Sequence, residues 1–184
     1  MTIRKILTEP DPFLRQKSLD VEVVNDEIRS LMDDMLETMY SAPGIGLAAV
    51  QIGILKRIIV IDVSKEDQKK EPLFLVNPKI TFKSQKISTY EEGCLSLPGY
   101  FAEIKRPAEC HVEYIGYDGK NKNLKADGIL STCIQHEIDH LNGKLFVDHI
   151  SSLKRSRIET KIKKLKKDGL IASRKETPNY KSAV

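Results

Sequence analysis

The chain has 184 residues, of which 30% are charged and 40% hydrophobic, and this size suits one domain with its own core. No apolar run approaches the length of a membrane span, and the apolar stretch near the N-terminus is too short for a signal peptide. Three widely spaced cysteines form no disulfide framework and indicate reduced thiols. We therefore expect a cytoplasmic protein without a membrane partner.

The net charge of +4 is unevenly distributed along the chain. Residues 151–184 contain eleven Lys and Arg against three Asp and Glu, whereas residues 1–150 contain nineteen against twenty-three. A mildly acidic body therefore carries a basic C-terminal segment.

The first predicted helix begins after Asn25, a suitable N-cap, and extends to about residue 40. Apolar residues recur in it at helical spacing, and its methionines are interpreted as core rather than as a binding groove. This stripe consists of Ile28, Leu31, Met32, Met35, Leu36 and Met39.

Residues 43–53 combine glycines with small apolar residues. A dinucleotide-binding loop is rejected, because the third glycine of its fingerprint and a preceding strand are both missing. Gln51 is the one polar side chain in this apolar run, and the local pattern alone favours a residue exposed at a turn.

Six segments are predicted to be strands from their β-branched or alternating residues: 57–63, 73–80, 86–91, 100–105, 109–117 and 122–126. Turn-type sequences, including Asn77-Pro78, Pro98-Gly99 and Asp118-Gly119, are expected to separate them. Short strands joined by hairpin-type turns predict antiparallel sheet and an α+β fold.

A second helix is predicted over residues 128–142, and it contains the pattern H-E-x-x-H. Asp127 is expected to cap this helix, and Gly143 to end it as its C′ residue. His136 and His140 are four residues apart, so they stand one above the other and can share a metal ion.

Glu137 falls within the apolar arc of this helix, whereas three polar residues point the opposite way. The arc is formed by Leu130, Cys133, Ile134 and Leu141, and the polar residues are Gln135, Asp139 and Asn142. A buried carboxylate is costly unless something pairs with it. A metal-bound water beside two imidazoles would be such a partner.

A catalytic metal site needs a third protein ligand and one position open to water. Phe146 occupies the place where an extended H-E-x-x-H pattern would have a third histidine, and the glutamates further along lie in the basic segment. Cys94 follows a glycine and precedes a Ser-x-Pro turn, where an irregular backbone can aim a thiolate at a site. Cys110 and Cys133 stand among apolar neighbours and are interpreted as small core residues.

A basic helix is predicted from Ser151 or Ser152 to Asp168, with Gly169 as its C′ residue and Leu170 contacting Leu165 in a Schellman ending. Its narrow apolar stripe is formed by Ile158, Ile162 and Leu165. Lysines and arginines cover the rest of its surface: Lys154, Arg155, Arg157, Lys161, Lys163, Lys164, Lys166 and Lys167.

Three segments, 44–51 (GIGLAAVQ), 92–96 (EGCLS) and 135–140 (QHEIDH), occur in this order and at a familiar separation. Together they make the chain resemble bacterial-type peptide deformylases, from the segment near residue 10 to the basic helix. The resemblance implies antiparallel sheets around a central H-E-x-x-H helix. We expect one catalytic domain, 1–170, that includes the helix 151–168, and a disordered tail, 171–184.

The resemblance also implies the chemistry. The metal ligands would be Cys94, His136 and His140, holding one divalent ion, Fe²⁺ first and Ni²⁺, Co²⁺ or Zn²⁺ as alternatives. Gln51 and the backbone N–H of Leu95 would stabilise the oxyanion. The reaction would remove the formyl group from the formyl-methionine of newly made polypeptides and release formate, with Glu137 as general base and acid.

A bound methionine side chain needs an apolar slot, for which we expect Ile45, Gly46, Ile129 and Cys133. The expected partners are N-formylmethionyl nascent peptides and, through the basic helix 151–168, the ribosome near its exit tunnel. No DNA partner is expected.

Two other classes remain open on the residues alone. A metallopeptidase would use the same hydroxide and glutamate on an internal peptide bond. A ribosome- or RNA-binding module would carry a structural metal, but such sites are usually closed by four protein ligands and the sequence offers three.

Overall fold

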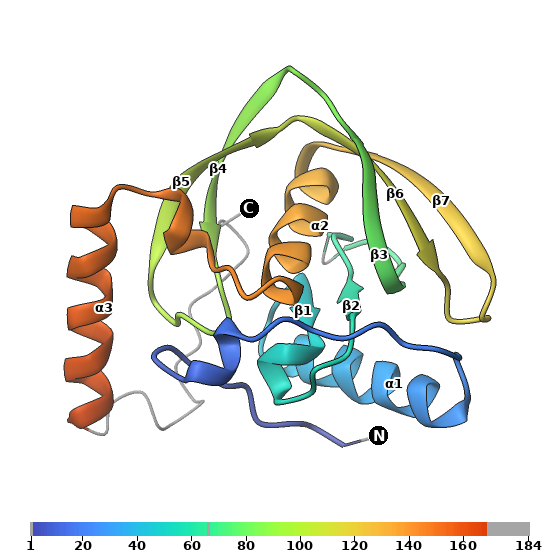
Figure 1. The fold of residues 1–184 in the computed structure, drawn as a ribbon, viewed down its shortest axis with the longest axis horizontal. Coiled ribbons are helices and arrows are strands. Elements are labelled where there is room, and N and C mark those ends of the chain that lie inside the picture. Colours follow the sequence, from blue (N-terminus) through green and yellow to red (C-terminus); the bar gives the residue numbers. More distant parts are fainter. Residues whose placement is uncertain (1, 66, 169–184) are drawn as a thin grey trace.

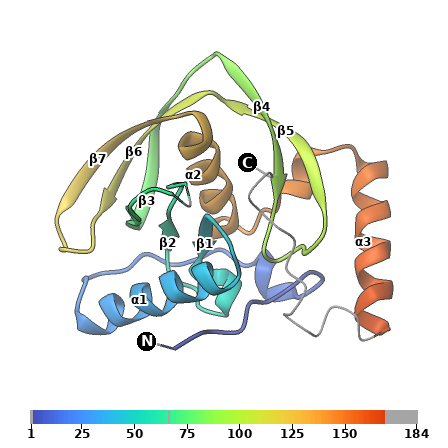
Figure 2. The same cartoon turned by 180° about the vertical axis from the view of Figure 1, so that it is seen from behind.

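The structure, a computed structural model, describes residues 2–65 and 67–168. Helix α2 (Gly128–Leu141) lies at its centre, between strands β4 and β5 on one side and β3, β6 and β7 on the other, in both Figure 1 and Figure 2. This arrangement confirms the predicted α+β class with antiparallel sheets around the H-E-x-x-H helix.

Two antiparallel sheets surround this helix. The larger sheet has the order β1-β2-β3-β6-β7, from Gly46–Ala48, Ile58–Ile61, Leu73–Lys83, Glu109–Ile115 and Asn121–Asp127. The smaller one pairs β4 (Ile87–Gly93) with β5 (Phe101–Pro107). Every strand pair is antiparallel, as expected for hairpin-type connections.

The predicted break at Asn77-Pro78 is wrong, because β3 continues through these two residues. Asn77 has a φ of 51°, and the pairing of β3 with β6 shifts between Val76 and Lys79, which is how a bulge absorbs the irregular backbone. The Asn77 side chain also exchanges two hydrogen bonds with the backbone of Val21, at 2.9 and 2.8 Å. A long-range contact therefore holds a residue pair that locally favours a turn.

Helix α1 (Asp26–Ser41) forms as predicted, with the Asn25 side chain accepting a hydrogen bond from the Ile28 N–H at 3.0 Å. Its apolar stripe is buried in a cluster that includes Leu47 of β1 and Val60 of β2. The helix thereby supports the glycine-containing segment that precedes β2.

Helix α2 is buried on more sides than an amphipathic helix would be, with ten of its fourteen residues buried. Gln135, expected to point away from the core, is 3% exposed and donates to the Pro107 carbonyl at 3.0 Å. Asp127 occupies the N-cap position and the helix begins at Gly128, as predicted, but the Asp127 side chain makes no capping hydrogen bond. Gly143 does end the helix with a φ of 73°, and a Cβ there would come within 2.8 Å of the Arg15 carbonyl carbon.

Helix α3 (Ser152–Lys167) stands beside the smaller sheet at the left of Figure 1. Ile162 from its apolar stripe is fully buried. Arg155 differs from the other basic residues of this helix in that its charge is paired: it binds Asp148 and Glu159, each at 2.7 Å, while its side chain stays partly exposed. The expected Gly169–Leu170 ending and the segment 171–184 lie outside the described residues.

The three cysteines are buried and form no disulfide among the described residues. In the ranges that the structure describes, no helix is long and apolar enough to cross a membrane.

Candidate active site

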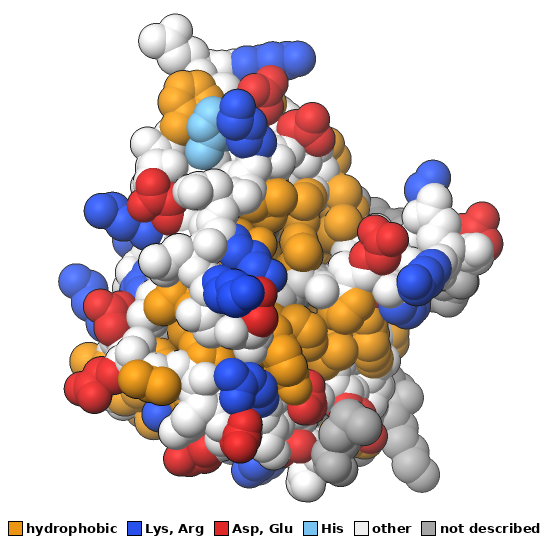
Figure 3. All heavy atoms as spheres, turned by 90° about the vertical axis from the view of Figure 1, so that its right-hand side faces the viewer, with side chains coloured by type: hydrophobic (Ala, Val, Ile, Leu, Met, Phe, Trp, Pro, Cys, Tyr) orange, Lys and Arg blue, Asp and Glu red, His pale blue; other side chains and the backbone are white. Residues whose placement is uncertain are grey.

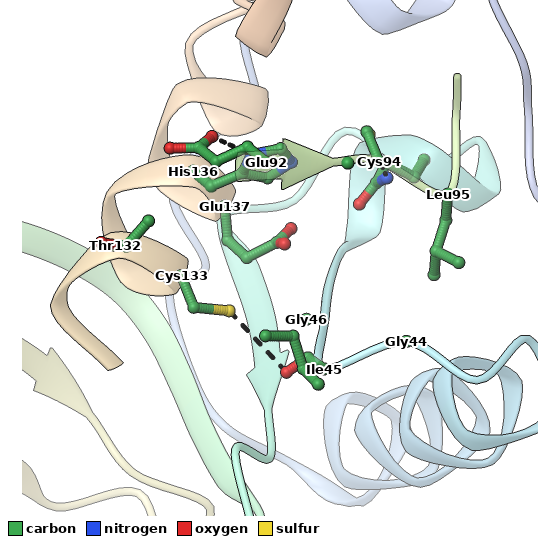
Figure 4. Close-up of a pocket in the computed structure, with 12 residues that line it drawn as sticks. Gly44, Ile45, Gly46, Glu92, Cys94, Leu95, Thr132, Cys133, His136 and Glu137 are labelled. Carbon is green, nitrogen blue, oxygen red and sulfur yellow. Dashed lines mark hydrogen bonds and ion pairs between the residues drawn. The ribbon is translucent and has the colours of Figure 1, made fainter. Parts of the chain in front are cut away.

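A pocket lies where the segment leading into β1, the end of β4 and helix α2 meet (Figure 4). These elements correspond to the three sequence segments singled out above. The pocket is lined by residues 44–46, by Gln51, by residues 92–95 and by Thr132, Cys133, His136 and Glu137. The fold thus brings together residues that are more than 80 positions apart in the sequence.

Three side chains in this region could hold a metal ion: Cys94, His136 and His140. Their donor atoms lie within 4.8 Å of one another, and the His140 Nε2 is 3.2 Å from both the Cys94 Sγ and the His136 Nε2. All three residues are at most 8% exposed. One thiolate and two imidazoles turned toward a common point are a donor set suited to iron, zinc and similar divalent ions.

Cys94 follows directly after β4, and polar groups surround its sulfur atom. The Ser96 N–H points at the Sγ from 3.4 Å, and the Gln51 amide nitrogen from 3.6 Å. Both donors help to fix the position of the sulfur at the end of β4.

Glu92 orients the first histidine. Its Oε2 is 2.8 Å from the His136 Nδ1, which leaves the Nε2 of that ring facing the other two ligands. Arg106 binds the same carboxylate through two nitrogens. Burial opposes ionisation of Glu92, but the hydrogen bonds from His136 and Arg106 outweigh it and lower the pKa of this carboxyl to about 2.

Glu137 points into the pocket beside these ligands (Figure 4). It is 4% exposed, and within the described residues its Oε2 has no hydrogen-bond partner. Burial raises the pKa of this carboxyl to about 7. Gly46 provides its space, since a Cβ there would collide with the Glu137 carboxylate and lie 2.8 Å from the Cys133 Sγ.

Comparison with known proteins decides the family. The family model described as polypeptide deformylase matches residues 3–156. The chain belongs to the peptide deformylase family. A peptide deformylase from Pelagibacter ubique is 60% identical over 171 residues, covering 93% of this chain and 99% of the relative. The relative from Agrobacterium fabrum is 57% identical over 164 residues, covering 89% of this chain and 96% of the relative.

Solved peptide deformylase structures share the fold. The Ehrlichia chaffeensis enzyme has a TM-score of 0.87 and 44% identity, covering 92% of this chain and 99% of that one. The structure of the same enzyme in complex with actinonin has a TM-score of 0.85 and 46% identity, covering 89% of this chain and 98% of that one. These matches confirm the resemblance inferred from the three segments. Peptide deformylases are metal-dependent hydrolases of protein biosynthesis that act on formylated nascent peptides.

Gln51 occupies a different environment from the one its local pattern suggested. It is 1% exposed rather than at an open turn. Its Oε1 accepts the Ala48 N–H at 2.8 Å, and its Nε2 donates to the Ser96 hydroxyl at 3.1 Å while reaching toward Cys94. Leu95, the other residue expected to act on the oxyanion, also lines the pocket.

Three of the four residues expected to form the side-chain slot line this pocket. Ile45, Gly46 and Cys133 line the pocket, whereas Ile129 does not, and Thr132 lines it instead. Ile129 lies one helical turn before Cys133 and is partly exposed, so the pocket ends short of it.

Sequence reasoning assigned no role to three residues of this site: Glu92, Arg106 and Thr132. Glu92 stands within the second family segment, but its contact with a histidine 44 positions away has no local signal. Arg106 likewise lies in a strand of alternating residues, where an arginine is usually exposed.

Proposed function

We propose that the chain removes the formyl group from N-terminal formyl-methionine with a divalent metal ion held by Cys94, His136 and His140. The observation that supports this most is the convergence of three buried donor atoms within 4.8 Å beside the pocket that Glu137 faces. A closed structural site would need a fourth protein ligand, and the described residues place only these three together.

The bound ion would supply a nucleophile from water at a pH near ~7 and polarise the formyl oxygen. Glu137 takes the proton of the attacking water and then protonates the leaving amine nitrogen, which frees formate. The Gln51 amide and the Leu95 N–H donate hydrogen bonds to the oxygen that becomes negative during attack. One such donor is typically worth about 10²–10³ in rate.

The strands beside the pocket suit an extended peptide substrate. In the described part of the chain, β1 pairs only with β2, and β4 only with β5, so each has one edge without a partner strand. Both strands border the pocket, through Gly46 and through Glu92 and Gly93. A substrate backbone can hydrogen-bond to such edges while its first side chain enters the slot formed by Ile45 and Cys133.

The family resemblance supports Fe²⁺ as the ion used in the cell, and a thiolate with two imidazoles also accepts Ni²⁺, Co²⁺ or Zn²⁺ as replacements. An iron–thiolate pair is readily lost to oxidation, so the protein must be purified without oxygen before elemental analysis. About one iron per chain is expected, and a stoichiometric content of another metal would contradict this assignment.

Substitution of Glu137 tests the mechanism. The variant Glu137→Gln should keep its metal and lose nearly all deformylation of a formyl-Met peptide, because the proton acceptor is gone and the ligands remain. An unformylated longer peptide, assayed in parallel with the wild-type protein, should stay intact. Cleavage of its internal bonds would favour the metallopeptidase alternative, and a fully active Glu137→Gln variant would refute the proposed base.

We also propose that α3 binds ribosomal RNA near the nascent-chain exit, which would place the enzyme in the cytoplasm. The residues that support this are exposed cations on one helix: Lys154, Arg157, Lys161, Lys163, Lys164 and Lys167. The opposite side of the molecule, seen in Figure 3, carries both signs of charge around an apolar area. A helix that neutralises phosphates releases counterions, so ribosome binding should weaken steeply with salt.

Charge substitutions on α3 test this contact without disturbing its packing. Replacing Lys161, Lys163 and Lys164 together by Gln should reduce co-sedimentation with ribosomes at low salt and flatten its salt dependence. A control variant replaces two lysines that are exposed on β3, Lys79 and Lys83, by Gln and should leave co-sedimentation unchanged. Equal binding by both variants would show that α3 is an ordinary solvated helix.

A further inference from the structure

A chain of polar side chains runs from the surface to the metal site. The His149 Nε2 is 2.7 Å from the Asp139 Oδ2, and the Arg106 Nη1 donates to this same oxygen at 2.8 Å. The other edge of Arg106 binds both carboxylate oxygens of Glu92. Glu92 in turn accepts from the His136 Nδ1–H at 2.8 Å. Four contacts therefore connect His149, which is one-third exposed, to a buried metal ligand.

This chain ties together elements that carry different ligands. Glu92 lies near the end of β4, two residues before Cys94, whereas His136 and Asp139 belong to α2. Arg106, on β5, is 5% exposed and bridges the two carboxylates. Its charge thus fixes the distance between the strand end that carries the thiolate and the helix that carries the imidazoles.

Asp139 and His149, the outer pair in this chain of contacts, matter because Arg106 is buried. If Asp139 no longer accepted from the Nη1, a guanidinium N–H would stay inside the protein without this partner, which costs more than the hydrogen bond itself contributes. The Asp139 side chain is 19% exposed and could turn toward solvent. His149 holds it on the inner side by binding the oxygen that Arg106 uses.

We propose that Asp139 and His149 are positioning residues of the metal site. Acting through Arg106 and Glu92, they hold the ring of His136 in the orientation that meets the other two ligands. This inference rests on the proposed function, because it requires a metal ion at His136. It assigns a role to Asp139, which the sequence pattern left on the outer face of α2, and to a residue of the 3-10 helix Phe146–His149.

The experiment compares metal binding by three variants with that of the wild-type protein. Asp139→Asn keeps the shape and removes the charge, His149→Ala removes the contact, and His149→Gln offers an amide donor in its place. The readouts are the Co²⁺ dissociation constant, from competition with a chelator, and the visible absorption of the Co²⁺ protein, which reports ligand geometry independently of turnover.

The matched control is Asp34→Asn. Asp34 is also buried and binds an arginine, Arg4, through two nitrogens at 2.7 and 3.0 Å, but it lies on α1 away from the metal site. This variant should lose stability and keep the wild-type Co²⁺ affinity and spectrum. It therefore separates a general loss of packing from a specific change at the ligands.

Loss of an outer partner typically weakens metal binding by about 10–100-fold, and we expect Asp139→Asn near the lower end of this range. His149→Ala should shift affinity and spectrum in the same direction by less, and His149→Gln should restore them. With formyl-Met peptide, kcat should fall while KM stays unchanged. The inference is overturned if Asp139→Asn changes Co²⁺ binding no more than Asp34→Asn does, or if His149→Gln behaves like His149→Ala. A wild-type protein that took up no Co²⁺ would instead refute the proposed function itself.

Discussion

Glu137 should make the metal-free protein less stable as the pH rises. Burial raises the pKa of its carboxyl from 4.5 to about 7, so the folded chain keeps a proton that the unfolded chain releases. Between these two values the folded state binds more protons, and the free energy of unfolding must therefore fall with increasing pH. A pKa difference of this size corresponds to about 3 kcal/mol of stability. This stability is fully lost once the pH rises past the pKa of Glu137 in the folded protein.

The effect can be isolated by comparison with Glu137→Gln. Glutamine has the same shape and no proton to release, so its stability should not include this decline. Both proteins would be treated with chelator and unfolded in urea at a series of pH values between 4.5 and 7. The wild-type protein should lose about 3 kcal/mol relative to the variant across this window. Parallel stability curves would refute the reasoning, because Glu137 would then be ionised in the folded protein.

Metal binding provides a second check on the same carboxyl. A cation beside Glu137 favours its ionised form, so the pKa of this group should fall when the site is loaded. The difference between wild-type and Glu137→Gln stability should then become nearly independent of pH over the same window.

Three further predictions concern the site and its support. Gly46→Ala should lose most turnover at nearly normal metal content, since the new methyl group would displace Glu137. Cys94→Ala should purify without metal, whereas Cys110→Ala should retain it, as elemental analysis of both would show. Ile162→Ala should cost about 2–5 kcal/mol in urea unfolding, because Ile162 is fully buried, and a cost near zero would mean that α3 is not docked in solution.

The elements that were predicted correctly have local causes. Asn25 caps α1 through a residue three positions away, and the left-handed conformation of Gly143 ends α2. Strand β1 was not predicted, because its three residues are extended only through pairing with β2, as in the pair Gly46 and Ile61. The continuation of β3 through Asn77 similarly depends on Val21, 56 positions away.

In the site, too, the features with local causes could be predicted, whereas those that depend on distant contacts could not. Helical spacing was enough to place His136 and His140 together, and the glycine before Cys94 and the Ser-x-Pro turn after it distinguished this cysteine from Cys110 and Cys133. The depth of the pocket along α2 is a property of the packed molecule, which is why Thr132 lines it and Ile129 does not. Ion pairs between strands and helices, as in the contact of Arg106 with Asp139 over 33 positions, have no sequence periodicity that could predict them.

The two faces of α3 determine which experiment can test ribosome binding. Its inner face belongs to the catalytic domain, because Ile162 lies in the same apolar cluster as Cys94 and Phe146, and Arg155 binds Asp148. Truncation after Ile150 would remove this face together with the exposed lysines, so a loss of ribosome binding could follow from damage near Cys94. Lysine substitutions keep the inner face intact and change only the charge that phosphates would meet. A truncated chain that retained both metal and turnover would show that the cluster around Cys94 closes without Ile162, and only then would truncation and lysine substitution test the same contact.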